Sequence, residues 1–86
     1  MVLVLDTKSV HRKVRIGGKD SSLRLEQPFW TTLKLIAVER RIPVSQLITA
    51  IDRWPDDATN LSSAVRVFIL QYARDHWVPK RHWTHE

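Results

Sequence analysis

The side chains best suited to recognition chemistry are Ser22 and Arg24, which alternate with Leu23 and Leu25 in the segment SSLRL. Residues two apart in a strand point to the same face, so this segment is predicted to be a short strand with one polar and one apolar face. The planar guanidinium of Arg24 can donate two hydrogen bonds to O6 and N7 of a guanine, and a serine hydroxyl can bond several base edges. On the residues alone, an ordinary exposed arginine is the commoner interpretation.

A helix predicted after Pro43 supplies a second candidate site, suited to anions. Its inner stripe consists of apolar residues at helical spacing, namely Val44, Leu47, Ile48 and Ile51. The first N–H groups of a helix lack partners within it and lie at the positive end of its dipole, which favours phosphate. We therefore expect the N–H groups of Val44 and Ser45, with the Ser45 hydroxyl, to contact phosphate. The alternative is a solvated serine in the first turn.

Cationic residues are concentrated near the N-terminus. The formal net charge is +5 and the sequence pI is about 10.3, which favours a polyanionic partner, either nucleic acid or an anionic membrane surface. Residues 1–19 are predicted to be a basic arm with a short strand near KVRI, followed by a turn or hinge at Gly17 and Gly18. The candidate phosphate contacts are Lys13, Arg15 and Lys19. A solvated, disordered arm is the alternative.

Asp20 complicates this assignment because a carboxylate that faces phosphates is repelled by them. Three placements would resolve the conflict. Asp20 lies outside any DNA groove that the strand enters, accepts a hydrogen bond from a cytosine amino group, or pairs with Lys19 or a cation of the arm.

The composition argues against several other classes of chemistry. The chain has no cysteine, so it can form neither a disulfide framework nor a thiolate zinc site, which suits a reducing cytosol. The serine pairs at 21–22 and 62–63 have no histidine at a meaningful spacing, so we expect no enzymatic activity and no cofactor. His76, His82 and His85 do not follow a zinc-binding spacing. The apolar start MVLVLD is too short for a membrane span or a signal sequence, so a cytoplasmic protein is expected.

Two further helices are predicted on either side of the anion site. The first begins at Pro28, whose fixed φ suits a first helical turn, and ends near Arg40 and Arg41. Its apolar stripe comprises Phe29, Leu33, Ile36 and Ala37, flanked by Trp30. The last helix begins at Asn60, a strong N-cap, and is apolar around most of its surface. In a chain of 86 residues, which buries a modest core, such a helix suggests an interface between subunits.

Three segments in order resemble one subfamily of the ribbon-helix-helix family of bacterial DNA-binding proteins. SSLRLEQPFW resembles its S-x-x-L-E-x-x-F-W strand and helix start, AVERRIPVSQLITAID its helix-turn-helix segment, and NLSSAVRVFIL its N-L-S-S-A-x-R-x-F-x-L signature. With KVRIGGKDSS before the strand, the resemblance covers roughly residues 13 to 72. Pro43 departs from the pattern, which usually has a serine there, and the tail after Tyr72 lies outside it.

The resemblance implies a mainly helical fold with a short N-terminal strand, in which two chains form an intertwined homodimer. The strand of each chain would pair antiparallel with the same strand of the other, and this ribbon would enter the major groove of double-stranded DNA. A sequence-specific regulator with base contacts from Ser22 and Arg24 is therefore expected. The expected division is a basic arm at 1–19, a ribbon-helix-helix domain with a third helix at 20–74, and a tail at 75–86.

An alternative function is an antitoxin-like interaction module that binds a partner protein through its C-terminal region, with DNA binding secondary or absent. The tail RDHWVPKRHWTHE mixes the cations Lys80 and Arg81 with the aromatic residues Trp77 and Trp83. Such aromatic side chains could cover a dimer, bind a partner or stack on nucleic acid.

Overall fold

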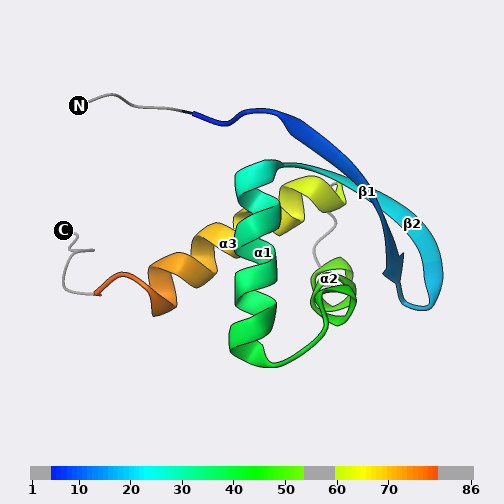
Figure 1. Ribbon diagram of the computed structural model, residues 1–86. Helices are drawn as coiled ribbons and strands as arrows, with labels where there is room; N and C mark the ends of the chain where they lie inside the picture. Colours follow the sequence, from blue (N-terminus) through cyan, green and yellow to red (C-terminus); the bar gives the residue numbers. More distant parts are fainter. Residues whose placement is uncertain (1–4, 54–59, 80–86) are drawn as a thin grey trace.

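The computed structural model describes residues 5–53 and 60–79, and these form two strands followed by three helices. In chain order they are β1 (Ser9–Ile16), β2 (Lys19–Glu26), α1 (Gln27–Arg40), α2 (Val44–Asp52) and α3 (Leu61–His76). The strands form a hairpin beside the helices, α1 crosses α3, and α2 lies between the end of α1 and the hairpin (Figure 1). The mainly helical fold class predicted from the sequence is confirmed.

Two adjacent glycines form the turn of the hairpin. Gly17 and Gly18 have φ angles of 59° and 84°, and a two-residue hairpin turn of the type that matches strand twist requires positive φ at both central residues. The strands pair antiparallel, with Ile16 opposite Lys19 at the turn. The turn predicted at the glycines is confirmed, and the short strand expected near KVRI is part of the eight-residue β1.

The hairpin corrects one expectation from the sequence, that the partner strand of β2 belongs only to a second chain. β1 pairs with β2 along its whole length within the same chain. The sequence signal for β1 is the alternation of Lys13 and Arg15 with Val14 and Ile16, at the two-residue period of a strand. Its basic residues also suit a solvated arm, so this signal does not identify β1 as the partner of β2. Within the described residues the sheet has two strands, so the other edge of β2 carries no strand.

The hairpin presents one face to the helices and the other to solvent. Leu23 and Leu25 are 2% and 0% exposed, and they share their face with the partly buried apolar side chains of β1. Cross-strand partners lie on the same face, so the residues between them lie on the opposite one. We name this opposite face the outer face; its exposed residues are Ser9, His11, Lys13, Arg15, Asp20, Ser22 and Arg24.

Helix α1 begins directly after β2. Glu26 is its N-cap in an extended conformation, and Pro28 lies in the first turn as predicted. At the other end, Arg41 adopts a left-handed conformation with a φ of 58°, and its N–H bonds back to the carbonyl of Val38. This turn directs the chain into α2 at Val44.

The starts of α2 and α3 differ in their caps. The side chain of Asn60 accepts a 2.8 Å hydrogen bond from the N–H of Ser63, which confirms the predicted start of α3. Pro43 is the N-cap of α2 and provides no side-chain hydrogen bond. The first N–H groups of α2 are therefore left without a capping side chain.

One hydrophobic core joins the hairpin and the helices. Its largest fully buried side chains are Trp30, Leu25, Leu33, Ile36, Ile48 and Val65. Trp30 also donates its indole N–H to the carbonyl of Val10 at 3.0 Å and so ties α1 to β1. On α3, Ile69 joins the core, whereas Val67 and Leu70 remain 55% and 59% exposed. The apolar stripes predicted for α1 and α2 thus face the core.

Candidate nucleic-acid interface

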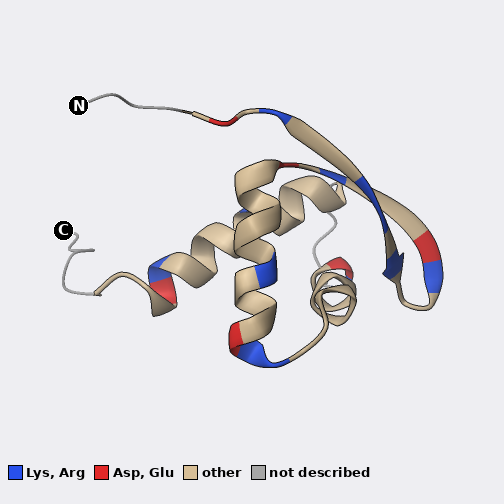
Figure 2. Cartoon of the chain, in the orientation of Figure 1, with Lys and Arg blue, Asp and Glu red and all other residues tan. Residues whose placement is uncertain are grey.

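The outer face of the hairpin brings most of the predicted DNA contacts together. Ser22 lies opposite Lys13, and Arg24 lies opposite His11. Directly opposite residues have Cβ atoms about 4.5–5.5 Å apart, so these side chains form a continuous surface. Lysine and arginine occur along both strands of the hairpin and again at the turn between α1 and α2 (Figure 2).

Lys19 does not share this surface. It lies opposite Ile16, whose side chain packs against the core, so Lys19 leaves the sheet on the side of the helices while remaining exposed. Arg12 lies on that side too, with its guanidinium carbon 5.7 Å from the centroid of the Trp30 ring. The alternation of side chains along the strands therefore separates two groups of cations.

Asp20 pairs with Arg15 on the outer face, which is one of the placements that the sequence leaves open. The carboxylate Oδ1 lies 3.1 Å from a guanidinium nitrogen. The two side chains are 86% and 66% exposed, so the pair is worth at most about 1 kcal/mol. The contact offsets a charge that would repel phosphate, and it is weak enough to exchange for another partner.

The N-terminus of α2 offers a second surface for anions. The N–H groups of Gln46 and Leu47 both bond to the carbonyl of Pro43 at 3.1 Å. The structure gives the N–H groups of Val44 and Ser45 no acceptor among the described residues, and the Ser45 side chain is exposed. Two backbone donors and a hydroxyl are thus available at the positive end of a helix dipole.

One hydrogen bond links the hairpin turn to this helix, and a second, within the helix, holds the threonine that accepts it. The N–H of Gly17 donates to Oγ1 of Thr49 at 3.0 Å, and the Thr49 hydroxyl donates to the carbonyl of Ser45 at 2.8 Å. The hairpin turn is therefore attached to the same helix whose first turn presents free N–H groups. A surface that reads bases and one that positions phosphates need such a fixed relation.

Hydrogen bonds connect helix α3 to the junction of β2 and α1. The Ser62 hydroxyl donates to the backbone carbonyl of Arg24 at 2.8 Å, and Arg66 donates two hydrogen bonds to the carboxylate of Glu26, at 3.0 and 3.2 Å. The Arg66 guanidinium also lies 5.7 Å from the centroid of the Phe29 ring. Its hydrogen bond to Glu26 is the main cause that lowers the pKa of this carboxyl below its ordinary value of 4.5. We name Ser62 and Arg66 the α3 clasp.

The α3 clasp was not predicted from the sequence, where the serine pair at 62–63 is considered only as a possible nucleophile. A signal was present in NLSSAVR, in which a hydroxyl and a guanidinium are four residues apart on one helix face. Which partners they take depends on contacts between distant parts of the chain. Arg24 and Glu26, two residues apart on β2, are those partners.

The two arginines at the end of α1 differ in their surroundings. Arg40 lies against α3, with Nη2 3.2 Å from Nε2 of His76 and its guanidinium carbon 5.1 Å from the Tyr72 ring centroid. Arg41 is exposed in the turn that leads into α2. Of these two cations at the end of α1, Arg40 is therefore engaged within the chain.

Glu39 extends this contact between α1 and α3. Its carboxylate accepts hydrogen bonds from the Tyr72 hydroxyl at 2.7 Å and from the Trp77 indole at 3.0 Å. These bonds, that of Tyr72 first, lower the pKa of Glu39, whereas burial and the bond to Glu39 raise the pKa of Tyr72. Trp77, assigned by the sequence to the tail, is thus held against α1.

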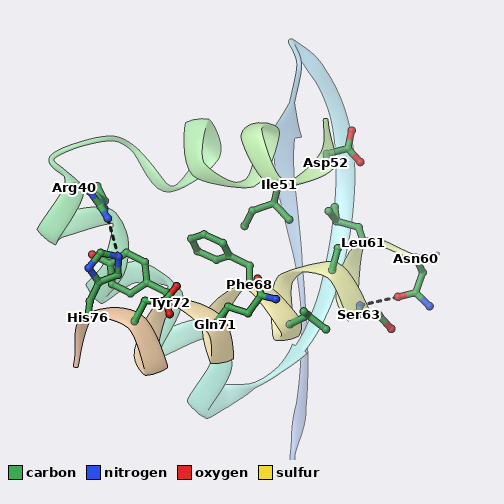
Figure 3. A pocket seen from close by; sticks show the side chains of 13 residues that line it. Arg40, Ile51, Asp52, Asn60, Leu61, Ser63, Phe68, Gln71, Tyr72 and His76 are labelled. Carbon is green, nitrogen blue, oxygen red and sulfur yellow. Dashed lines mark hydrogen bonds between the residues drawn. The ribbon is translucent and has the colours of Figure 1, made fainter. Parts of the chain in front are cut away.

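A groove between the C-terminal part of α2 and α3 lies apart from these surfaces (Figure 3). Ile51, Leu61 and Phe68 contribute apolar walls. Asp52 and Asp75 also line it, and their carboxylates would repel phosphate. The groove is therefore a poor candidate for nucleic acid.

Other candidate chemistry finds no support within the described part of the chain. No three histidine, aspartate or glutamate side chains of those residues gather as metal ligands, and none of their helices is long and apolar enough to cross a membrane. The remaining tail residues singled out in the sequence lie outside the described residues; they are Lys80, Arg81, His82, Trp83 and His85. Their roles stay predictions.

The order of β2, α1, a tight turn and α2 is that of a ribbon-helix-helix protein, in which a strand precedes two helices. The chain belongs to this family, since the family model described as a ribbon-helix-helix domain matches residues 9–73. The match confirms the resemblance inferred from the three segments. It also includes β1 and supports a DNA-binding protein of the transcription-regulator type.

One similar solved structure is that of an uncharacterized protein from Bordetella pertussis Tohama I. The sequences are 34% identical, and the TM-score is 0.65. The similarity covers 78% of this chain and 57% of that chain, so this chain spans little more than half of the other. No curated protein matches the chain.

Proposed function

We propose that the protein is a sequence-specific transcriptional regulator of bacterial type, cytoplasmic, that binds double-stranded DNA as a homodimer. The outer faces of two β2 strands enter the major groove. The observation that carries this proposal is the division of β2 into two faces: Leu23 and Leu25 are buried, while Ser22 and Arg24 between them are exposed. A ribbon of two strands has the width that the major groove admits.

The proposed contacts divide into those that read bases and those that position the protein. Arg24 donates two hydrogen bonds to a guanine, worth about 1–3 kcal/mol of discrimination, and Ser22 bonds a base edge with less selectivity. The N–H groups of Val44 and Ser45 bind a phosphate. The cations assigned to further phosphates are Lys13, Arg15 and Lys19, the last from the other side of the hairpin.

The homodimer is supported by what a single chain leaves uncovered. Leu35 and Val38 of α1 are 52% and 71% exposed, and Val67 and Leu70 of α3 are exposed as well. The two residues of each pair are three apart on their helix and so lie on one face, and a chain this short gains burial by association. The strandless edge of β2 offers backbone N–H and C=O groups to a second strand.

Selection of binding sites from random duplexes, at a stated salt concentration, tests the proposal. We expect a palindromic consensus, because operator symmetry mirrors the two-fold symmetry of a dimer. Arg24→Ala should lose the preference for that consensus and remain dimeric by light scattering. Arg53→Ala is the matched control, since it removes an exposed arginine at the C-terminal end of α2, whereas Ser45 lies at the N-terminal end. Enrichment of no sequence, or a folded monomer, would show the proposal to be wrong.

The alternative of a protein-interaction module is separated from the regulator by truncation. Because α3 continues to His76 and Trp77 bonds to Glu39, the truncation belongs after Pro79 rather than after Tyr72. The chain of residues 1–79 should bind the selected duplex as tightly as the full chain. Normal folding of that chain with loss of DNA binding would contradict base reading by β2 and assign DNA recognition to the last residues.

A further inference from the structure

The hairpin gives each chain two rows of outward side chains instead of one. The β2 row is Asp20, Ser22 and Arg24; the β1 row is His11, Lys13 and Arg15. We infer that two copies join β2 to β2 about an axis at Ser22, giving a four-stranded sheet in which the β2 rows read bases and the β1 rows bind phosphates. This inference rests on the proposed function and specifies how its surface is assembled.

The backbone of β2 shows which residues face the second copy. Gln27 donates its N–H to the carbonyl of Lys8 on the β1 side, and backbone groups of successive strand residues alternate between the two edges. Asp20, Ser22 and Arg24 therefore direct their N–H and C=O groups away from β1. The Ser62 hydroxyl bonds the Arg24 carbonyl from that side. A carbonyl oxygen accepts two hydrogen bonds, so one remains for a second strand.

Charge selects the register among those that this edge allows. With the axis at Ser22, Asp20 of one copy lies opposite Arg24 of the other, and opposite charges across a strand pair are favourable. An axis at Leu23 would place Asp20 opposite Glu26, and an axis at Arg24 would place two arginines opposite each other. Both arrangements set like charges face to face, which is destabilising. An axis nearer the hairpin turn shortens the ladder.

In this register the second copy completes the base-contact site. Asp20 exchanges its weak, exposed pairing with Arg15 for Arg24 of the second copy. Its carboxylate then orients the guanidinium that donates to guanine, so Asp20 acts as a positioning residue. Arg15 is released for phosphate. The conflict between an acidic side chain and a phosphate-binding face is thereby removed.

The spacing of the strands assigns the two rows to different parts of the groove. Neighbouring strands lie about 4.8 Å apart, so the β2 strands lie about 2.4 Å from the axis and the β1 strands about 7 Å from it. The major groove is about 12 Å wide, so the β2 rows fit inside it and the β1 rows lie over its walls. Those walls carry the phosphates, which His11 and Lys13 therefore meet.

A single cysteine tests the position of the axis, because the chain has none of its own. Ser22→Cys is expected to form an interchain disulfide on mild oxidation, since hydrogen-bonded residues opposite each other have Cα atoms about 5.5 Å apart. Lys13→Cys is the matched control on the same face. Its two copies would lie about 14 Å apart across the sheet and should stay reduced. Cross-linking of Lys13→Cys without that of Ser22→Cys would overturn the inference.

Binding to the selected duplex and to a scrambled duplex tests the roles of the rows. Lys13→Gln should weaken binding to both duplexes alike. It should also reduce the slope of log affinity against log salt by about 1.8 per dimer, which is about 0.9 for each contact. Lys34→Gln, at an exposed position on α1, is the charge-matched control and should leave the slope unchanged. A wild-type slope for Lys13→Gln would overturn the assignment of β1. Absence of any selected sequence would instead refute the proposed function.

The positioning role of Asp20 has a different signature. Asp20→Asn should lower the ratio of affinities for the selected and scrambled duplexes at least several-fold without lowering affinity for the scrambled duplex, because the substitution removes a negative charge from the outer face. Asp20→Glu, which keeps the carboxylate, should restore part of the ratio. An unchanged ratio in Asp20→Asn would contradict the register centred on Ser22.

Discussion

The hydroxyl of Ser62 donates a 2.8 Å hydrogen bond to the backbone carbonyl of Arg24, the residue proposed to read bases. Four residues along α3, Arg66 binds Glu26, which lies two residues along β2. Four residues of a helix rise about 6 Å, and two residues of a strand advance about 6.6 Å, so the two spacings match. The third helix thus holds the backbone at the end of the strand that carries the base contact.

The hydrogen bond from Ser62 should contribute measurably to stability. Ser62→Ala is expected to lower the free energy of unfolding by about 1 kcal/mol, the usual net worth of one hydrogen bond. Ser63→Ala is the neighbouring control, since the bond at that position uses the backbone N–H and survives the substitution. Denaturant midpoints of both variants provide the comparison. Equal effects would show that the hydroxyl bond to Arg24 carries no special weight.

The glycine turn should tolerate residues according to their backbone preferences. Gly17 has positive φ and no atom within 4 Å of the position that a Cβ would occupy, so substitution there meets backbone strain without a steric clash. Gly17→Val should destabilise the chain by about 1–3 kcal/mol, the cost of holding a non-glycine residue in this region. Gly17→Asn should cost much less, because Asn-Gly suits this turn. Thermal melting distinguishes them, and equal melting temperatures would contradict the turn.

Acid should unfold the chain partly through Glu26 and Glu39. Hydrogen bonds from Arg66 and Tyr72, respectively, lower the pKa values of these carboxyls in the folded state. The unfolded chain then takes up protons at higher pH than the folded chain. The stability that these two carboxyls contribute is therefore fully present above pH 4.5 and is lost as the pH falls through their lowered pKa values.

The double variant Glu26→Gln, Glu39→Gln should therefore show a shallower loss of stability below pH 4.5 than the wild type. Urea midpoints measured at intervals from neutral to acid pH test this. Asp52→Asn is the control for an exposed carboxylate outside these two contacts. A double variant that follows the wild-type curve would show that other groups cause the acid sensitivity.

The first turn of α2 should separate stability from DNA binding. Ser45→Asp places a negative charge near the positive end of the helix dipole, which stabilises the helix by about 0.3–1 kcal/mol, yet the same charge repels a bound phosphate. We expect weaker binding to selected and scrambled duplexes alike with unchanged or higher thermal stability. Ala50→Asp, exposed further along α2, is the matched control. Unaltered DNA affinity in Ser45→Asp would remove this helix end from the interface.

Local features of the sequence predicted much of the fold. Pro28 and Asn60 act at helix starts, Gly17 and Gly18 form a turn, and the alternation around Leu23 marks a strand with two faces. Each of these depends on preferences of a residue and its immediate neighbours, which a single chain displays directly.

Contacts between distant segments could not be inferred in the same way. No local feature of the β1 sequence identifies β2 as its partner, and the lysine and arginine of β1 also suit a solvated arm. Arg40 illustrates the same limit, because the sequence shows only that it lies near a helix end, while its partners Tyr72 and His76 come from a helix more than 30 residues away. Long-range packing decides which of several chemically suitable partners a cation takes.

The most direct test of the proposed DNA recognition is the ratio of dissociation constants for the scrambled and selected duplexes, measured at one salt concentration for the wild type and for Arg24→Ala. If β2 reads bases through Arg24, the ratio should fall at least tenfold, since each of the dimer's two bidentate contacts to guanine is worth about 1–3 kcal/mol and 1.4 kcal/mol is a factor of ten. A wild-type ratio in a folded, dimeric Arg24→Ala would contradict it.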